Sequence, residues 1–322
     1  MSLLVDGQWK PGWLESETED GRFVRMDSQF RDVIRPEADA EFPAESGRYL
    51  LYVSYACPWA HRTLIFRQLK GLAAHIALAV VHPFMGEPGW SFDDDFPGST
   101  GDPLFGARYV HEIYTRADPG YTGIVTVPFV FDSVSQRIVN NESSEIIRML
   151  NSAFDAITGN RADYYPQPLR ARIDQINART YDKLNNGVYR AGFATTQTAY
   201  EEGFDAVFDT LDWLELQLSD GRPYLLGETL TEADWRVFPT LVRFDAVYFS
   251  HFKCNRQRIV DFPNLWAYVR RLYAIEGVAD TVRLDHIKHH YYRSHPSINP
   301  TRIVPKGPDI RFDGASAGPV LP

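Results

Sequence analysis

Cysteine is scarce in this sequence, with two residues in a chain of 322. That number excludes a scaffold held by several disulfides and a zinc site built from four cysteines. Long apolar stretches are missing too, since no run approaches the roughly 18 residues of a membrane-spanning helix. Residues 1–9 carry no apolar segment behind a basic start. We therefore expect no secretory leader, no membrane partner and a cytoplasmic location.

Positive charge is in deficit, because 33 Lys and Arg face 42 Asp and Glu and leave a net charge of −9. Nucleic-acid-binding domains usually present a basic face, so we expect no nucleic-acid partner. The sequence also lacks a Walker A loop, a G-x-S-x-G motif and a G-x-G-x-x-G motif, which leaves nucleotidase, serine hydrolase and dinucleotide-enzyme functions without support. Apolar residues still form 44% of the chain, enough for a sizeable core.

The apolar pattern divides the chain into an α/β part and an all-helical part. Buried strands at 49–54 and 75–81 flank a helical stretch, which predicts a βαβ unit with parallel strands. A Gly/Pro/Asp-rich insertion at 82–121 is interpreted as a long loop. Two further strands are expected at 126–132 and 137–140, ahead of a helix that begins near Glu142.

From Leu169 onward the apolar residues recur at helical spacing only. Thr231 and Asp234 stand in a capping-box-like arrangement ahead of one of these helices. The change of period predicts an N-terminal extension, an α/β domain, an all-helical domain and a C-terminal tail, at residues 1–45, 46–152, 165–295 and 296–322.

Cys57 is the candidate reactive group. It follows the first strand and precedes Pro58, a residue that favours the first turn of a helix. Backbone N–H groups at a helix N-terminus stabilise an anion, so we expect a lowered thiol pKa and a nucleophilic sulfur. Ala60 stands where a second cysteine would close a disulfide, so an external thiol must resolve any mixed disulfide. The alternative is a small buried apolar residue, which is how we interpret Cys254.

Short motifs occur in order along the chain: Cys57-Pro-Trp-Ala-His-Arg62, Gly89-Trp-Ser-Phe-Asp93, Arg116-Ala-Asp-Pro119, Thr126-Val-Pro128, Asn141-Glu-Ser143, Asn185-Asn-Gly-Val-Tyr-Arg-Ala-Gly-Phe193, Val242-Arg-Phe-Asp245 and His251-Phe-Lys-Cys254. Together they resemble the glutathionyl-hydroquinone reductases, also called Xi-class glutathione transferases, over about residues 5–300. The resemblance implies an α/β plus all-α fold, with a thioredoxin-like N-terminal domain and a C-terminal helical glutathione-transferase domain. It also implies a homodimer that binds no cofactor. Such an enzyme uses glutathione as co-substrate to convert glutathionyl-hydroquinones into hydroquinones and glutathione disulfide.

The resemblance assigns glutathione binding to Trp90, Val127, Pro128, Glu142 and Ser143. It implies a cis bond before the proline, which would let Val127 pair with an extended peptide. Glu142 and Ser143, at a helix start, suit the ammonium and the carboxylate of the γ-glutamyl end. The residues alone leave other roles open: a strand-edge proline, simple helix capping, and core filling by the tryptophan.

Three tyrosines are assigned to the hydroquinone by the same resemblance. Tyr189 and Tyr291 match positions that contact it, and with Cys57 they form the expected catalytic set; Tyr248 is a further candidate. Phenolic O–H groups can hydrogen-bond to hydroquinone hydroxyls and move a proton. The chain has 17 tyrosines, so packing is the alternative that residue type alone favours.

Ile124 departs from the family pattern, in which an arginine that contacts glutathione usually stands between the glycine and Val-Thr-Val-Pro. Losing such a charged contact weakens binding by about 1.5–3 kcal/mol unless a neighbour such as Arg108 or Arg116 replaces it.

His286, His289 and His290 have the spacing of metal ligands on a helix, but no glutamate motif accompanies them, so we expect no metal. Two other functions stay open: a general thiol transferase or dehydroascorbate reductase, and a non-catalytic binding protein on the same fold.

Overall fold

The computed structural model describes residues 3–11 and 18–313, which form two compact units. The first contains Val24–Asp163 and Asp285–Ser294 together with the start of the chain. The second contains Thr18–Phe23, Tyr164–Leu284 and the chain from His295. The four segment boundaries from the sequence stay a prediction, and the contacts add that residues 285–294 pack with the first unit.

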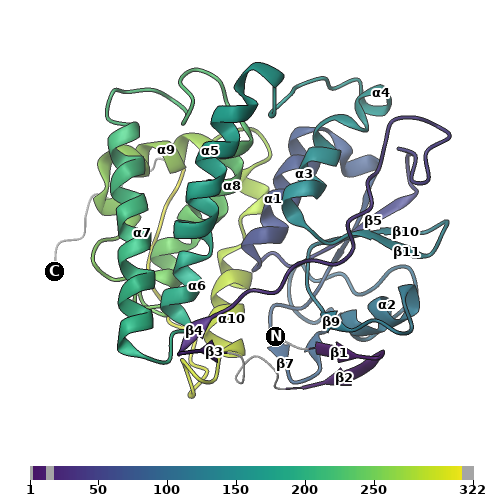
Figure 1. Ribbon diagram of the computed structural model, residues 1–322, viewed down its shortest axis with the longest axis horizontal. Helices are drawn as coiled ribbons and strands as arrows, with labels where there is room; N and C mark the ends of the chain where they lie inside the picture. Colours follow the sequence, from purple (N-terminus) through teal and green to yellow (C-terminus); the bar gives the residue numbers. More distant parts are fainter. Residues whose placement is uncertain (1–2, 12–17, 314–322) are drawn as a thin grey trace. The chain divides into compact units, whose positions relative to one another are not determined.

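A four-stranded sheet is the centre of the first unit, in the order β11-β10-β5-β6. Its strands are β5 (Tyr49–Val53), β6 (Ala77–Val80), β10 (Phe129–Asp132) and β11 (Arg137–Asn140). β5 and β6 are parallel and joined through α1 (Pro58–Leu69), which confirms the predicted βαβ unit. α1 and α3 (Ser143–Ser152) lie side by side against this sheet (Figure 1). β5 and β10 are buried along their whole length, as a core sheet requires.

The segment 82–121, predicted to be a loop, contains a hairpin and a helix, so that prediction was wrong in part. The remaining elements of this unit are β1 (Leu3–Val5), β2 (Gln8–Lys10), β7 (Met85–Gly86), β8 (Gly89–Trp90), α2 (Val110–Ala117), β9 (Gly123–Ile124), α4 (Asp155–Thr158) and α10 (Leu284–Ser294). α2 forms because the Glu112 carboxylate accepts the Tyr109 N–H at 3.1 Å and caps the first turn. Its apolar face, which includes Ile113 and Tyr114, is then buried.

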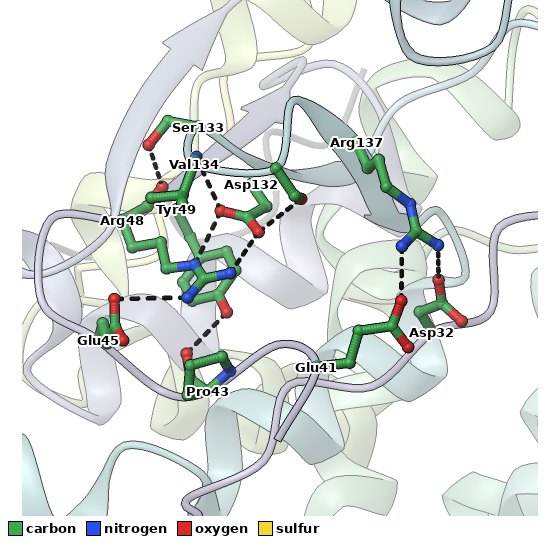
Figure 2. Close-up of polar contacts among 11 residues, drawn as sticks. Asp32, Glu41, Pro43, Glu45, Arg48, Tyr49, Asp132, Ser133, Val134 and Arg137 are labelled. Carbon is green, nitrogen blue, oxygen red and sulfur yellow. Dashed lines mark hydrogen bonds and ion pairs between the residues drawn. The ribbon is translucent and has the colours of Figure 1, made fainter. Parts of the chain in front are cut away.

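Charged side chains fasten the chain before β5 to the sheet, as Figure 2 shows. Arg48 donates from Nε and Nη2 to the Asp132 carboxylate, at 2.8 and 2.6 Å, and the Asp132 side chain is fully buried. Arg137 reaches Asp32 at 2.9 Å and Glu41 at 2.5 Å, but these groups are exposed. The first pair is therefore a buried anchor, and the second is a surface pair of small energetic weight.

The second unit is a bundle of helices, as predicted, with one short hairpin. Its elements are β3 (Thr18–Glu19), β4 (Arg22–Phe23), α5 (Arg170–Thr180), α6 (Gly187–Gly192), α7 (Gln197–Gln217), α8 (Glu232–Arg243) and α9 (Pro263–Tyr273). π-helical turns extend α5 at Tyr181–Asn185 and α8 at Phe244–Tyr248. The capping box of Thr231 and Asp234 is present, with the Thr231 N–H 2.8 Å from the carboxylate. Within the two described ranges, no helix has both the length and the apolarity to cross a bilayer.

Candidate functional site

Cys57 occupies the N-cap of α1, with Pro58 in the first turn, as the sequence predicted. Its backbone is extended, at φ −76° and ψ 122°, and its carbonyl accepts the His61 N–H at 3.0 Å. The side chain is half-buried, and its Sγ–H donates to the Val127 carbonyl at 3.3 Å. The sulfur therefore lies at the positive end of the helix dipole and beside the segment before Pro128.

The bond between Val127 and Pro128 is cis, as the resemblance implies. The Tyr114 hydroxyl on α2 links this segment to the start of α3. It donates to the Thr126 carbonyl at 2.9 Å and accepts from the Asn141 side-chain amide at 3.3 Å. Burial raises the pKa of Tyr114, so the phenol stays protonated. Tyr114 was not predicted from the sequence, and it fixes two parts of the candidate glutathione site together.

The start of α3 carries Glu142 at its N-cap and Ser143 at its first position. Glu142 accepts the Ser144 N–H at 3.0 Å, so the capping role left open by the sequence is present. Ser143 is buried, and its hydroxyl accepts a long hydrogen bond from Arg62 Nη1 at 3.4 Å. The Arg62 guanidinium also lies over the Trp59 ring, 4.6 Å from its centroid. Positive charge from α1 therefore reaches the N-terminus of α3, where an anion would be stabilised.

Trp90 and Tyr291 both pack against the His290 ring in the first unit. The Trp90 indole, at the end of β8, stacks on His290 of α10 with 4.7 Å between centroids, and His290 meets the Tyr291 ring edge-on at 5.4 Å. Trp90 is 8% exposed and Tyr291 is 1% exposed. The packing role that the sequence left open is therefore real for both residues, and a role in binding stays a prediction.

Ile124 is buried in β9, where it pairs with Leu3 of β1. Both candidate substitutes for the expected arginine are exposed and lie over aromatic rings. Arg116 stacks 4.3 Å from the centroid of Phe105, and Arg108 lies 5.3 Å from that of Tyr109. Both guanidinium groups thus have aromatic partners, and replacement of the lost arginine by either of them stays a prediction.

Tyr189 and Tyr248 come together in the second unit, in a cluster of aromatic rings. Tyr189 on α6 is half-buried, and Tyr248, at the end of the π-helical turn after α8, is fully buried. Their centroids are 6.2 Å apart, and Phe252 lies 5.5 Å from each. Phe193 and Phe23 also pack around Tyr189, each at 6.2 Å. The sequence predicted the two tyrosines and none of the phenylalanines.

Two of the three α10 histidines lie within hydrogen-bonding distance of backbone carbonyls. His286 Nε2 lies 2.8 Å from the Pro97 carbonyl and His290 Nδ1 lies 3.0 Å from that of Pro83. Across residues 3–11 and 18–313, no group of three or more His, Cys, Asp or Glu is arranged to hold a metal ion. Cys254 is fully buried, and desolvation raises its pKa to about 12, which leaves it an inert thiol near neutral pH.

Comparison with known proteins gives matches along nearly the whole chain. Residues 56–153 match the family profile of the glutathione S-transferase N-terminal domain, and residues 197–271 match that of the C-terminal domain. Glutathionyl-hydroquinone reductase PcpF of Sphingobium chlorophenolicum is 57% identical over 96% of this chain and 96% of its own length. Two solved structures superpose closely. The Xi-class glutathione transferase of Natrialba magadii has a TM-score of 0.92 and 48% identity, over 97% of this chain and 95% of that one. Glutathione-bound YqjG of Escherichia coli K-12 has a TM-score of 0.88 and 48% identity, over 97% of each chain.

Proposed function

The chain belongs to the glutathionyl-hydroquinone reductases, the Xi class of the glutathione transferases, and on that premise we propose that it reduces glutathionyl-hydroquinones to hydroquinones with glutathione. The membership confirms the predicted fold: a thioredoxin-like N-terminal domain and a C-terminal helical glutathione-transferase domain. It also makes the chain an enzyme of the glutathione transferase superfamily. Glutathione is its co-substrate, in keeping with the relative whose structure contains bound glutathione.

One observation carries the proposal: the Cys57 sulfur lies at the N-terminus of α1, 3.3 Å from the Val127 carbonyl. The α1 N–H groups favour the thiolate, and the backbone at Val127 is where an extended tripeptide would pair. A glutathionyl sulfur bound there would be within reach of Cys57. Ala60 occupies the position of a second cysteine, so the mixed disulfide must await a second glutathione.

The proposed glutathione contacts come from three segments of the first unit. Val127 and Pro128 would pair with the peptide backbone, and Trp90 would flank it. Glu142 and Ser143 would hold the ammonium and carboxylate of the γ-glutamyl end, because the Ser143 hydroxyl lies at a helix N-terminus next to the Arg62 guanidinium.

The proposed chemistry has two steps. In the first, the Cys57 thiolate attacks the sulfur of the glutathionyl-hydroquinone, and an S–S bond forms as the C–S bond breaks. The electron pair of the C–S bond passes to the ring carbon, which takes a proton, and the hydroquinone leaves. Tyr189 and Tyr291 would bind the hydroxyls and move the proton, and Tyr248 is a further candidate contact to the hydroquinone. In the second step, the thiolate of glutathione attacks the Cys57–glutathione disulfide, releasing glutathione disulfide and restoring the Cys57 thiolate.

Turnover of glutathionyl-menadiol with added glutathione tests this function, with glutathione disulfide and menadiol as readouts. We expect one of each per substrate consumed. Turnover of dehydroascorbate or simple mixed disulfides, with none of glutathionyl-menadiol, would replace the proposal by the general thiol transferase. Slow alkylation of Cys57 by iodoacetamide at mildly acidic pH, with no turnover of any substrate, would indicate the non-catalytic binding protein.

We further propose that the enzyme is a homodimer of the cytoplasm. The family resemblance supports the dimer, and the need for reduced glutathione and a reduced Cys57 supports the compartment. Sedimentation equilibrium at micromolar concentration would give twice the chain mass of 36.8 kDa for the dimer, and a single chain mass would contradict it.

A further inference from the structure

We propose that Phe23, in the hairpin formed by β3 and β4, is a positioning residue for Tyr189 and so a determinant of hydroquinone recognition. The inference rests on the proposed function, which gives Tyr189 its contact with the substrate. Phe23 lies near the N-terminus, outside the two segments that match the glutathione S-transferase family profiles. The inference therefore gives this early part of the chain a role in hydroquinone binding.

The hairpin is fastened to the helices of the second unit. Arg22 donates from Nε and Nη2 to both oxygens of Glu202 on α7, at 2.9 and 2.7 Å. The Thr195 N–H donates to the Gly21 carbonyl at 3.1 Å. Gly21 has a φ of +79°, and a Cβ on it would lie 2.7 Å from the Thr196 methyl group. The tip of the hairpin therefore lies directly on the N-terminal turn of α7, and Figure 1 shows β3 and β4 at the ends of α6 and α7.

These contacts of the hairpin place the Phe23 ring against the Tyr189 ring. Phe23 is 7% exposed, stacks on Tyr189 with 30° between ring planes, and lies 5.6 Å from Phe193. Phe252 meets Tyr189 from another side, edge-on at 5.5 Å. The phenol ring of Tyr189 is thus confined between aromatic neighbours, and among Phe23, Phe193, Tyr248 and Phe252 it is Phe23 that lies farthest from it in the sequence.

Confinement matters because a phenol that binds or protonates a substrate must hold its oxygen in place. Groups at reactive sites need positions fixed to about 0.5 Å, and a misplacement of about 1 Å costs on the order of a hundredfold in rate. Tyr189 is half-buried with Phe23 stacked on it, so removal of the Phe23 ring would take away one of the rings that confine the phenol and expose more of it. Loss of the Phe23 ring is therefore expected to weaken use of the hydroquinone while leaving Cys57 and glutathione chemistry intact.

The test compares two substrates of the full-length enzyme. Glutathionyl-menadiol requires both Cys57 and Tyr189, whereas the mixed disulfide of glutathione and mercaptoethanol requires only Cys57. We expect Phe23→Ala and Phe23→Leu to lower kcat/KM for glutathionyl-menadiol about tenfold and to leave the disulfide reaction within about twofold. Phe23→Tyr keeps the ring and should restore the first reaction. The leucine variant keeps the apolar burial, so it stays informative where the alanine variant does not fold.

Two controls separate positioning from a general structural role. Phe42 is 2% exposed and lies under the Arg137 guanidinium in the first unit, so Phe42→Ala should lower stability with no selectivity between the two substrates. In a Tyr189→Phe background, where the hydroxyl is gone, Phe23→Ala should cause no further loss. Equal losses on both substrates, or an additive loss in that background, would overturn the Phe23 assignment. A wild-type enzyme that never turns over glutathionyl-menadiol would overturn the proposed function itself, and this inference with it.

Discussion

Arg48→Met is predicted to destabilise the first unit strongly. The substitution removes both Arg48 donors from Asp132, whose side chain is fully buried and keeps the Ser135 hydroxyl at 2.7 Å and the Val134 N–H at 3.0 Å. Removing one partner of a buried ion pair costs about 3–5 kcal/mol, because the remaining charge stays desolvated. For a domain of this size that is roughly 10 °C in Tm. Arg137→Gln is the matched control, since its partners Asp32 and Glu41 are exposed and such pairs contribute about 0–1 kcal/mol.

Urea unfolding followed by circular dichroism measures both variants, between pH 7 and pH 3. Burial alone would raise the pKa of Asp132, but Arg48, Ser135 and the Val134 N–H hold it below its usual value. The pKa of Asp132 is thus lower in the folded state than in the unfolded state, where it is near 4. This difference stabilises the folded state at pH values above the unfolded pKa, and the stabilisation is lost as the pH falls through the folded pKa. In the Arg48→Met variant, the free energy of unfolding should therefore fall less between pH 7 and pH 3 than it does in the wild-type protein. A loss no larger than that of Arg137→Gln, or an unchanged fall between pH 7 and pH 3, would refute the reasoning.

Three further predictions follow from single positions. Ile124→Arg should lower KM for glutathione about tenfold or more, by restoring a charged contact worth about 1.5–3 kcal/mol, and an unchanged KM in steady-state kinetics would show that the arginine is dispensable here. Cys254→Ala should leave iodoacetamide labelling at pH 7 and turnover unchanged, because burial raises the pKa of that thiol to about 12; mass spectrometry that finds the label on Cys254 would contradict this. Gly192→Ala should lower the free energy of unfolding by about 1–3 kcal/mol, because the new Cβ would lie 2.2 Å from the buried Phe252 ring, and a wild-type urea midpoint would show that the ring moves aside without cost.

Much of the first unit could be predicted from sequence because its signals are local. Continuous apolar runs marked β5 and β6, and Pro58 marked the start of α1 and with it the place of Cys57. α2 was missed, and α10 was expected only as part of the all-helical segment, because neither helix has such signals. α2 is short and lies in a Gly- and Pro-rich segment. The buried residues of α10 are mostly polar or aromatic: His286, His290, Tyr291 and Tyr292. Ile287 is its one buried aliphatic residue, so the helical repeat of apolar residues is weak in this part of the sequence.

The candidate site shows the same division between local and long-range information. The motif around Cys57 is contiguous, so its chemistry could be inferred from the order of its residues. The link from Tyr114 to Asn141 and the stacking of Phe23 on Tyr189 join residues far apart in the sequence. Such contacts follow from the tertiary packing of side chains, and a single sequence carries no pattern that pairs them.

The central claim is the covalent step at Cys57, and a single-turnover experiment tests it most directly. The reduced enzyme is mixed with one equivalent of glutathionyl-menadiol in the absence of glutathione, quenched with acid, and analysed by intact and peptide mass spectrometry. We predict one equivalent of menadiol released, one glutathione bound through Cys57, and neither product with Cys57→Ser. Menadiol release by an enzyme whose Cys57 stays unmodified, or by the serine variant, would contradict the account.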